Sequence, residues 1–254
     1  MMKNYKIILA YDGGRYNGWQ KQGNTDNTIQ EKLEGILTAL AGCPTEIYGS
    51  GRTDAGTHAY GQVANFHMNW LGTPEKLMDS INEKLPEDIA VLFIQAVSPK
   101  FHSRLSAKAK IYEYTIWNSK KPPVFDRKYV FWSQKSLDIE KMKTASKFFL
   151  GEHDFKSFCA NKRMKKSTVR QIYDIQFYCS VDKVTIAYYG NGFLYQMVRI
   201  MTGTLIEVGE GKYKPEEIPL ILEALDRKKA GFTAPAKGLA LKEVFYEEGQ
   251  DGND

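Results

Sequence analysis

The chain has 254 residues, of which 43% are hydrophobic and 26% are charged. It contains no run of about 18 apolar residues, so the sequence predicts no membrane-spanning helix. A chain of this length buries a core as one large or two small domains. Its three cysteines form no C-x-x-C pair and its first residues do not resemble a secretory signal, so we expect a cytoplasmic protein without disulfides.

The positive charge is unevenly distributed along the chain. Lys and Arg number 35 against 30 Asp and Glu, but the last twelve residues hold five acids and no base. The first 242 residues therefore carry a net charge of +10. Residues 156–170 contain six basic residues and no acid. Such a basic segment is suited to bind an anionic polymer. The alternative is a solvated loop that only keeps the protein soluble.

The predicted elements of the first half mix strands and helices. Residues 5–11 (YKIILAY) lead into Asp12-Gly13-Gly14, which predicts a strand followed by a tight turn. Apolar spacings of three and four predict an amphipathic helix over 28–40, capped by Thr28 or Asn27 and stopped by Gly42 and Pro44. We further expect a helix over 74–85 and strands over 62–68, 89–97 and 110–117.

The second half repeats this mixture. We expect helices over 139–150, 194–208 and 215–225, a hairpin of 171–179 with 183–189, and a strand over 241–246. Strands follow one another in pairs, which predicts an α+β fold with largely antiparallel sheets. The polar, proline-containing segment 118–123 predicts a boundary between two similar α/β halves, 1–121 and 122–254. Two such halves would flank a central active-site cleft.

Residues 49–62 (GSGRTDAGTHAYGQ) contain the strongest candidates for catalysis. Four glycines accompany Arg52, Asp54 and His58 between two predicted strands. Glycine allows close backbone approaches, so Asp54 can reach a bulky substrate while Arg52 holds or neutralises it. The alternative is an Asx turn of Thr53 and Asp54, with Arg52 paired to a surface acid.

The segment GRTDAGTHAYGQV resembles the active-site loop of the tRNA pseudouridine synthase A family. The resemblance extends over almost the whole chain, in order through YDGGRYNGWQKQ, TIQEKLEGIL, INEKLPEDI, FHSRLSAKAKIYEYTI, GEHDFKSF, GNGFLYQMVRIMTGTL and TAPAKGLALKEVFY. Gly14, Thr57 and Ser103 depart from the family's common residues without removing a charged or aromatic catalytic group. The resemblance implies a nucleophilic Asp54 and active-site roles for Arg52, Tyr112 and Arg199.

The implied reaction isomerises uridine to pseudouridine in the tRNA anticodon stem-loop, at positions 38, 39 and 40. It breaks the N1–C1′ bond and joins C5 to C1′ without a change in water or redox state, so we expect no metal and no organic cofactor. A carboxylate stabilises or traps the positive charge at C1′, the role of Asp54. Arg199 would keep that carboxylate ionised; the alternative for Arg199 is an exposed helix charge.

Tyr112 and Tyr114 share one face of their predicted strand. A structural tyrosine is the alternative, but the resemblance implies that the Tyr112 ring stacks on the target uracil and that its hydroxyl assists proton transfer. Arg52 would fill the space of the flipped base or grip its phosphate. The RNA backbone would be gripped by the basic segment, with Lys162, Arg163, Lys165 and Lys166, and by Arg15, Lys21, Lys108 and Lys110.

The competing hypothesis is a non-catalytic RNA-binding protein or RNA chaperone of the same fold. Such a binder gains nothing from a carboxylate near phosphates, so Asp54 beside Arg52 favours the enzyme. The four scattered histidines form no metal-binding pair and no phosphate-binding glycine loop occurs, which argues against a zinc hydrolase and a nucleotide site. The family resemblance also implies a homodimer whose subunits together bind tRNA.

Overall fold

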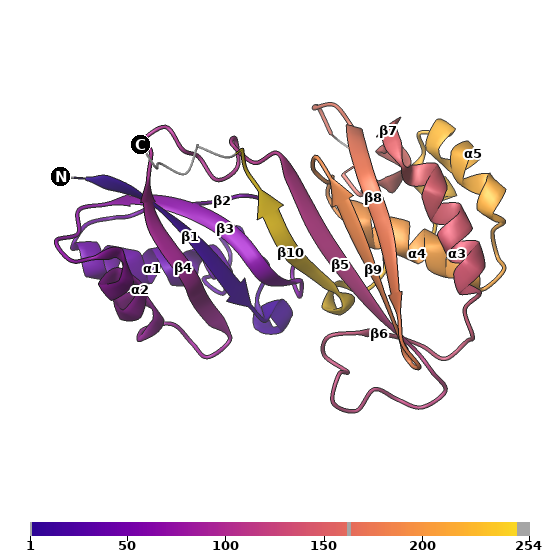
Figure 1. Cartoon of the computed structure of the whole chain (residues 1–254), viewed down its shortest axis with the longest axis horizontal. Coiled ribbons are helices and arrows are strands. Elements are labelled where there is room, and N and C mark those ends of the chain that lie inside the picture. Colours follow the sequence, from indigo (N-terminus) through magenta and orange to yellow (C-terminus); the bar gives the residue numbers. More distant parts are fainter. Residues whose placement is uncertain (1, 162–163, 248–254) are drawn as a thin grey trace. The chain divides into compact units, whose positions relative to one another are not determined.

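The computed structural model describes residues 2–161 and 164–247, and the chain divides into two units (Figure 1). The first unit comprises Met1–Lys108 with Leu241–Asp254, and the second comprises Ala109–Ala240. The halves expected from sequence, 1–121 and 122–254, divide the chain elsewhere. Each unit combines helices with a largely antiparallel sheet, which confirms the predicted α+β class.

The sheet of the first unit has the strand order β4-β1-β3-β10. Its strands are β1 (Lys3–Tyr11), β3 (His58–Met68), β4 (Ile89–Val97) and β10 (Leu239–Phe245), and the short β2 (Ile47–Gly49) also pairs with β3. Strand β1 is antiparallel to both β3 and β4. Strand β3 begins four residues before the predicted start, because Ala59 already pairs with Tyr11 of β1.

Helices α1 (Ile29–Ala41) and α2 (Pro74–Asn82) cover one face of this sheet (Figure 1). The Thr28 hydroxyl accepts a hydrogen bond from Glu31 N, and Gly42 ends α1 with a φ of 69°, as N- and C-terminal capping requires. Helix α2 stops at Asn82, three residues before its predicted end. Residues 83–85 continue instead as turns, in which Lys84 N and Leu85 N both donate to Ile81 O at 3.1 Å.

The sheet of the second unit has the order β5-β9-β8-β7. Its strands are β5 (Ala109–Asn118), β7 (Gly151–Asp154), β8 (Val169–Cys179) and β9 (Lys183–Gly190). The short β6 (Phe131–Ser133) pairs in parallel with β5. The predicted hairpin is therefore confirmed as β8 and β9, which are antiparallel.

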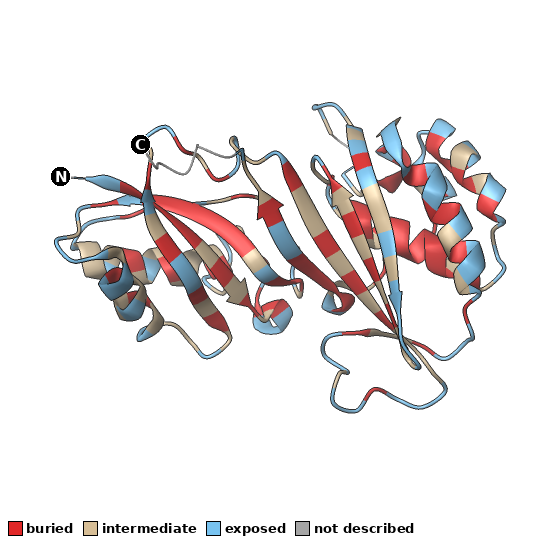
Figure 2. Cartoon of the chain, in the orientation of Figure 1, coloured by how far each residue is buried: buried red, intermediate tan, exposed pale blue. Residues whose placement is uncertain are grey.

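Helices α3 (Ile139–Ser146), α4 (Met197–Gly209) and α5 (Ile218–Glu223) lie beside this second sheet (Figure 1). Eleven of the thirteen residues of α4 are buried, and Figure 2 shows α4 as the most buried of the three helices. Helix α4 starts three residues later than predicted because Gln196 adopts a left-handed φ of 60°. Within the described ranges no helix has the length and apolarity to span a bilayer.

Short 3-10 turns complete the secondary structure. They are η1 (Gly13–Arg15), η2 (Lys147–Phe149), η3 (Lys156–Phe158), η4 (Pro215–Glu217), η5 (Arg227–Lys229) and η6 (Ala236–Gly238). The predicted helices over 139–150 and 215–225 each contain one of them, η2 after α3 and η4 before α5. A 3-10 turn commonly begins or ends a helix in this way.

Candidate active site

Residues 50–57, the Asp54 loop, connect β2 to β3 in the first unit. Asp54 is half-buried, and Arg52 two residues earlier is exposed. The loop closes on itself through a hydrogen bond of 3.0 Å from Thr57 N to Asp54 O, with Gly56 at a φ of 77°. The nucleophile expected from sequence therefore lies at a tight turn that a substrate can approach.

A buried hydrogen-bond network supports the Asp54 loop from beneath. Gln62 on β3, which is fully buried, donates to Gly51 O at 3.0 Å and accepts from the Ser50 hydroxyl at 2.7 Å. Tyr11 at the end of β1 lies 2.9 Å from Thr53 Oγ1 and 3.4 Å from the Gln62 amide. Because Thr53 is engaged with Tyr11, its hydroxyl supports the loop against the sheet.

Glycines in the segment before α1 let it approach the same loop closely. A Cβ at Gly13 would lie 1.9 Å from Thr57 O, and one at Gly18 would lie 2.7 Å from Thr53 O. Gly18 also has a φ of 91°, a conformation that side chains disfavour. Backbone hydrogen bonds from Trp19 N to Thr53 O and from Gly56 N to Tyr16 O join the two segments at 3.1 and 3.3 Å.

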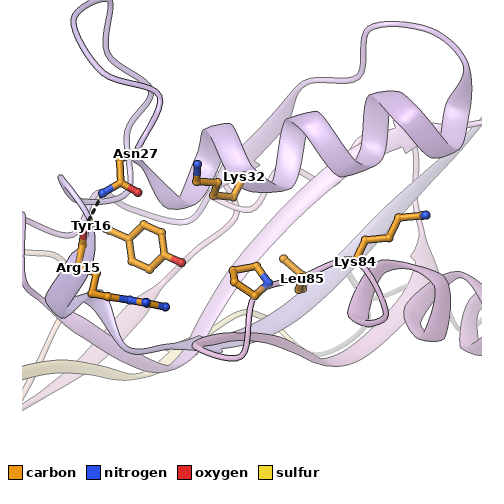
Figure 3. Close-up of a pocket in the computed structure, with 7 residues that line it drawn as sticks. Arg15, Tyr16, Asn27, Lys32, Lys84 and Leu85 are labelled. Carbon is orange, nitrogen blue, oxygen red and sulfur yellow. Dashed lines mark hydrogen bonds between the residues drawn. The ribbon is translucent and has the colours of Figure 1, made fainter.

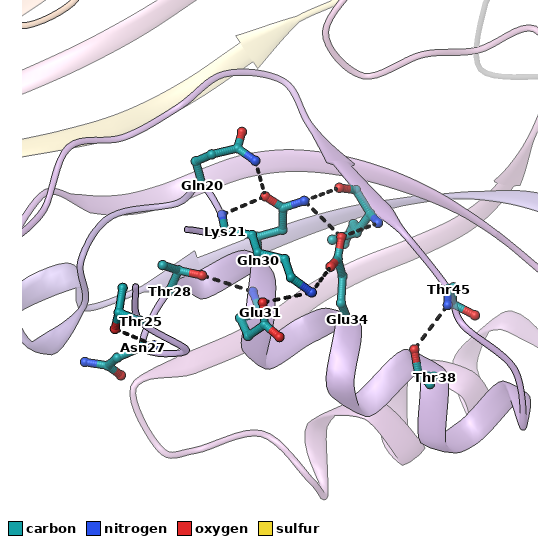
Figure 4. Close-up of polar contacts among 11 residues, drawn as sticks. Gln20, Lys21, Thr25, Asn27, Thr28, Gln30, Glu31, Glu34, Thr38 and Thr45 are labelled. Atoms are coloured by element: carbon teal, nitrogen blue, oxygen red, sulfur yellow. Dashed lines mark hydrogen bonds and ion pairs between the residues drawn. The ribbon is translucent and has the colours of Figure 1, made fainter. Parts of the chain in front are cut away.

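Arg52 is tied to helix α1 through two glutamines. Its Nε donates to Gln20 Oε1 at 3.0 Å, and the Gln20 amide donates to Gln30 Oε1 at 2.8 Å. Figure 4 shows how Gln30 in turn reaches Glu34 and how Lys21 bridges Glu31 and Glu34. Among the described residues Arg52 has no acidic partner, unlike the surface ion pair that sequence reasoning kept as an alternative.

Sequence reasoning did not single out Gln20 or Gln62 as functional residues. Gln62 lies next to the end of the GRTDAGTHAYGQV segment, and Gln20 lies in the WQKQ sequence before α1. Their place in or near these motifs is visible in the sequence. Their hydrogen bonds, from Gln62 to Gly51 and from Arg52 to Gln20, depend on segments that only folding brings together.

The second unit contains Tyr112 and Arg199. Tyr112 on β5 is buried, with 8% of its surface exposed, and meets the Phe193 ring edge to face at 5.2 Å. Tyr112 and Tyr114 are both buried on β5, as the predicted alternation requires. The burial of Tyr112 is compatible with a purely structural role. It is equally compatible with a ring that is held in a fixed orientation for stacking.

Arg199 on α4 is half-buried rather than exposed. Its Nε donates to Ala234 O at 2.7 Å, while Ala234 N donates to Arg199 O at 3.1 Å. The Tyr114 hydroxyl donates to the neighbouring Pro235 O at 2.8 Å. Burial raises the pKa of Tyr114 well above its usual range although the Arg199 charge acts in the opposite direction, so this tyrosine stays neutral.

The basic residues expected to bind RNA differ in exposure and in ion pairing. Lys165 and Lys166 are exposed, and Lys162 and Arg163 lie outside the described residues. Three others form ion pairs: Arg15 with Asp88 at 2.6 Å, Lys21 with Glu31 at 3.0 Å and Lys108 with Glu247 at 2.7 Å. The carboxylates of these pairs compensate part of the positive charge of the three cations.

Histidine and acidic side chains are spread over the part of the chain that the structure describes, residues 2–161 and 164–247. This part of the chain has no group of three or more His, Cys, Asp or Glu side chains arranged to hold a metal ion. The closest approach of a histidine to an acid near the Asp54 loop is His58 Nδ1 to Asp12 Oδ1, at 3.0 Å. Both residues support the segment beneath the loop, since His58 Nδ1 also lies 3.2 Å from Gly13 N.

Comparison with known proteins gives consistent matches. The family model for tRNA pseudouridine synthase matches residues 7–105 and 145–247, which include Arg52, Asp54 and Arg199. The chain is 47% identical over 245 residues to tRNA pseudouridine synthase A of Bacillus sp. (strain KSM-64), covering 96% of this chain and all of that protein. It is 44% identical to tRNA pseudouridine synthase A 2 of Bacillus anthracis and to tRNA pseudouridine synthase A of Acetivibrio thermocellus, with the same coverage.

These matches define an isomerase that forms pseudouridine. The chain belongs to the tRNA pseudouridine synthase family.

Proposed function

We propose that this protein converts uridine to pseudouridine at positions 38, 39 and 40 of the tRNA anticodon stem-loop, with Asp54 as the nucleophile. The observation that carries the proposal is the construction of the Asp54 loop. A half-buried carboxylate sits on a tight turn that Gln62 and Tyr11 support by hydrogen bonds. A catalytic group needs such a rigid support to hold a reactive geometry.

The proposed chemistry centres on C1′ of the target ribose. As the N1–C1′ bond breaks, positive charge develops at C1′ and the Asp54 carboxylate stabilises or traps it. The uracil then turns and C5 forms the new bond to C1′. The proton lost from C5 is balanced by the proton gained at N1, so no water, oxidant or reductant is consumed.

The remaining site residues have proposed roles toward the RNA. Tyr112 stacks on the uracil, and its hydroxyl assists the proton transfer. Arg199 supplies positive charge that favours the ionised carboxylate. Arg52 occupies the space left by the flipped base or holds its phosphate. The Gln20 hydrogen bond to Arg52 supports this role because it limits where the guanidinium can move.

The proposed substrate is bound mainly through its phosphates. The exposed Lys165 and Lys166, together with Lys162 and Arg163, would contact the RNA backbone through charge. We propose a cytoplasmic homodimer in which basic surfaces of both chains take part. Reading shape rather than sequence fits an enzyme that acts on three neighbouring positions.

Tritium release from tRNA labelled at uridine C5 tests this function. Asp54→Asn removes the charge and keeps the size, so turnover should fall on the order of 10⁴-fold or more while tRNA affinity stays close to wild type. Asp79→Asn, at an exposed acid of α2, is the control and keeps wild-type turnover. Turnover by Asp54→Asn would refute the nucleophile assignment. If the wild-type protein itself binds tRNA but releases no tritium, it is instead a non-catalytic RNA-binding protein.

A further inference from the structure

A pocket of about 530 Å³ opens in the first unit (Figure 3), and none of the side chains proposed for catalysis lines it. Its lining includes three basic side chains, Arg15, Lys32 and Lys84, together with Tyr16, Leu85 and Pro86. These residues come from the turn after β1, from α1 and from the segment that follows α2. A pocket of this size falls in the range that holds a small ligand or one part of a larger one.

The charge of the pocket is only partly compensated. Arg15 donates from Nε and Nη2 to Asp88 Oδ2 at 2.9 and 2.6 Å, and the Tyr16 hydroxyl donates to Asp88 Oδ1 at 2.7 Å. Asp88 is therefore matched by Arg15. In the part of the chain that the structure describes, Lys32 and Lys84 have no ion-pair partner. Two of the three basic residues that line the pocket therefore lack an ion-pair partner, and this excess of positive charge favours an anion.

The wall of the pocket is held in place by local hydrogen bonds. The Asn27 amide donates to Arg15 O at 2.6 Å, as the dashed line in Figure 3 shows. Tyr16 is 6% exposed, and its hydroxyl is fixed on Asp88. Because the wall is already ordered, an anion entering the pocket does not have to order Arg15 or Tyr16, which lowers the cost of binding.

The same wall is joined to the Asp54 loop. The carbonyl of Tyr16 accepts a hydrogen bond from Gly56 N at 3.3 Å, and Gly56 is two residues from Asp54. Gly13, three residues before Tyr16, packs directly against Thr57. An anion held against Tyr16 is therefore bound next to the segment that supports the candidate nucleophile.

We propose that this pocket binds a backbone phosphate of the RNA substrate at a nucleotide near the target uridine. The proposal rests on the proposed function, because it takes the anion to belong to the RNA. Lysine is a compact point charge that binds phosphate without a fixed fork geometry, and Lys32 and Lys84 approach the pocket from different elements. The Leu85 and Pro86 side chains supply an apolar wall for the adjoining sugar.

The test is the salt dependence of RNA binding by Lys32→Gln/Lys84→Gln. Losing the contacts to this one phosphate should lower the slope of log Kd against log salt by about 0.7 and raise Kd on the order of tenfold near physiological salt. The matched control is Lys76→Gln/Lys228→Gln, which removes two exposed lysines outside the pocket and should keep the wild-type slope. Both pairs are measured with unmodified tRNA and with its anticodon stem-loop fragment.

Three results would overturn the proposal: an unchanged slope, an equal change in the control pair, or a change seen only with full-length tRNA. The last result would place the phosphate in another arm of the tRNA. Tritium release by the wild-type protein is measured separately. Its absence refutes the proposed function, whereas normal release with an unchanged salt slope refutes only the phosphate pocket.

Discussion

The side-chain amide of Gln62 donates a hydrogen bond of 3.0 Å to the backbone carbonyl of Gly51, immediately before Arg52. The same fully buried side chain also contacts the hydroxyls of Ser50 and Tyr11. A buried polar network orders its surroundings when its members are satisfied and costs stability when they are not. Gln62 therefore links the sheet to the start of the Asp54 loop.

Replacing Gln62 by Leu tests this link. Loss of the amide leaves Gly51 O without its donor and Ser50 without its acceptor, so the free energy of unfolding should fall by about 2–3 kcal/mol. Displacement of the loop should lower kcat by about 10–100-fold with a smaller effect on KM. Urea unfolding and tritium release measure the two effects. Gln171→Leu, at an exposed glutamine of β8, is the control, and equal effects at both positions would contradict the role of Gln62.

Gly18 lies against the other side of the Asp54 loop. Gly18→Ala places a Cβ 2.7 Å from Thr53 O at a φ of 91°, so we expect a loss of about 2 kcal/mol in unfolding free energy and a lower kcat. At Gly23 a Cβ meets nothing within 4 Å, and Gly23→Ala should leave stability unchanged or raise it by up to about 1 kcal/mol. Thermal unfolding measures the stability of both variants. A Gly18→Ala variant as stable as Gly23→Ala would be inconsistent with this packing.

In the second unit, Gly203 allows α4 to approach the segment that accepts the Arg199 hydrogen bond. A Cβ there would lie 1.9 Å from Phe232 O, so Gly203→Ala should cost about 3 kcal/mol through overpacking and should weaken turnover. Gly35→Ala, on an exposed position of α1 with open space around it, should add about 0.5–1 kcal/mol. Calorimetric unfolding compares them. A stabilised Gly203→Ala would disprove the close contact.

Stability should fall at alkaline pH because of Tyr11. Burial raises the pKa of Tyr11 to about 12, although hydrogen bonds with Thr53 and Gln62 act to lower it. An unfolded tyrosine has a pKa near 10. Between about pH 10 and 12 the unfolded chain loses this proton while the folded chain keeps it, so Tyr11 removes about 1.4 kcal/mol of stability per pH unit.

Tyr11→Phe removes that dependence. Near neutral pH the variant should be about 1 kcal/mol less stable because the hydrogen bond to Thr53 is lost. As the pH rises from about 10 to 12, the difference between wild type and variant should shrink and then reverse. Urea unfolding over this range measures it, and parallel pH curves for the two proteins would argue against a buried, neutral Tyr11.

The elements with strong local signals could be predicted from sequence. The strand over 89–97 has the bounds of β4, and the helix over 28–40 agrees with α1 within one residue at each end. Apolar spacing, the Thr28 cap and the Gly42 stop are all local features. The sequence analysis assigns no bounds to strands β2, β6 and β7, because segments of three or four residues show no clear period.

The site shows the same division between local and long-range information. The Asp54 loop can be recognised from its own residues. The hydrogen bond from Gln62 to Gly51, and the one from Arg52 to Gln20, join segments that are 11 and 32 positions apart in sequence. A sequence pattern contains no distance information of this kind, so these supporting residues emerge only from the folded chain.

The place of β10 in the first unit has a consequence for synthesis on the ribosome. Residues 241–245 complete the sheet beside β3, where the Lys242 carbonyl meets Gly61 and the Phe245 carbonyl accepts from Lys108 N. At ~5–20 residues per second, the ribosome needs ~10–35 s to go from the end of β3 to β10. During that interval part of the β3 edge lacks its partner strand, and an open strand edge is a site for mispairing. The first unit is thus the first to be made and the last to be finished.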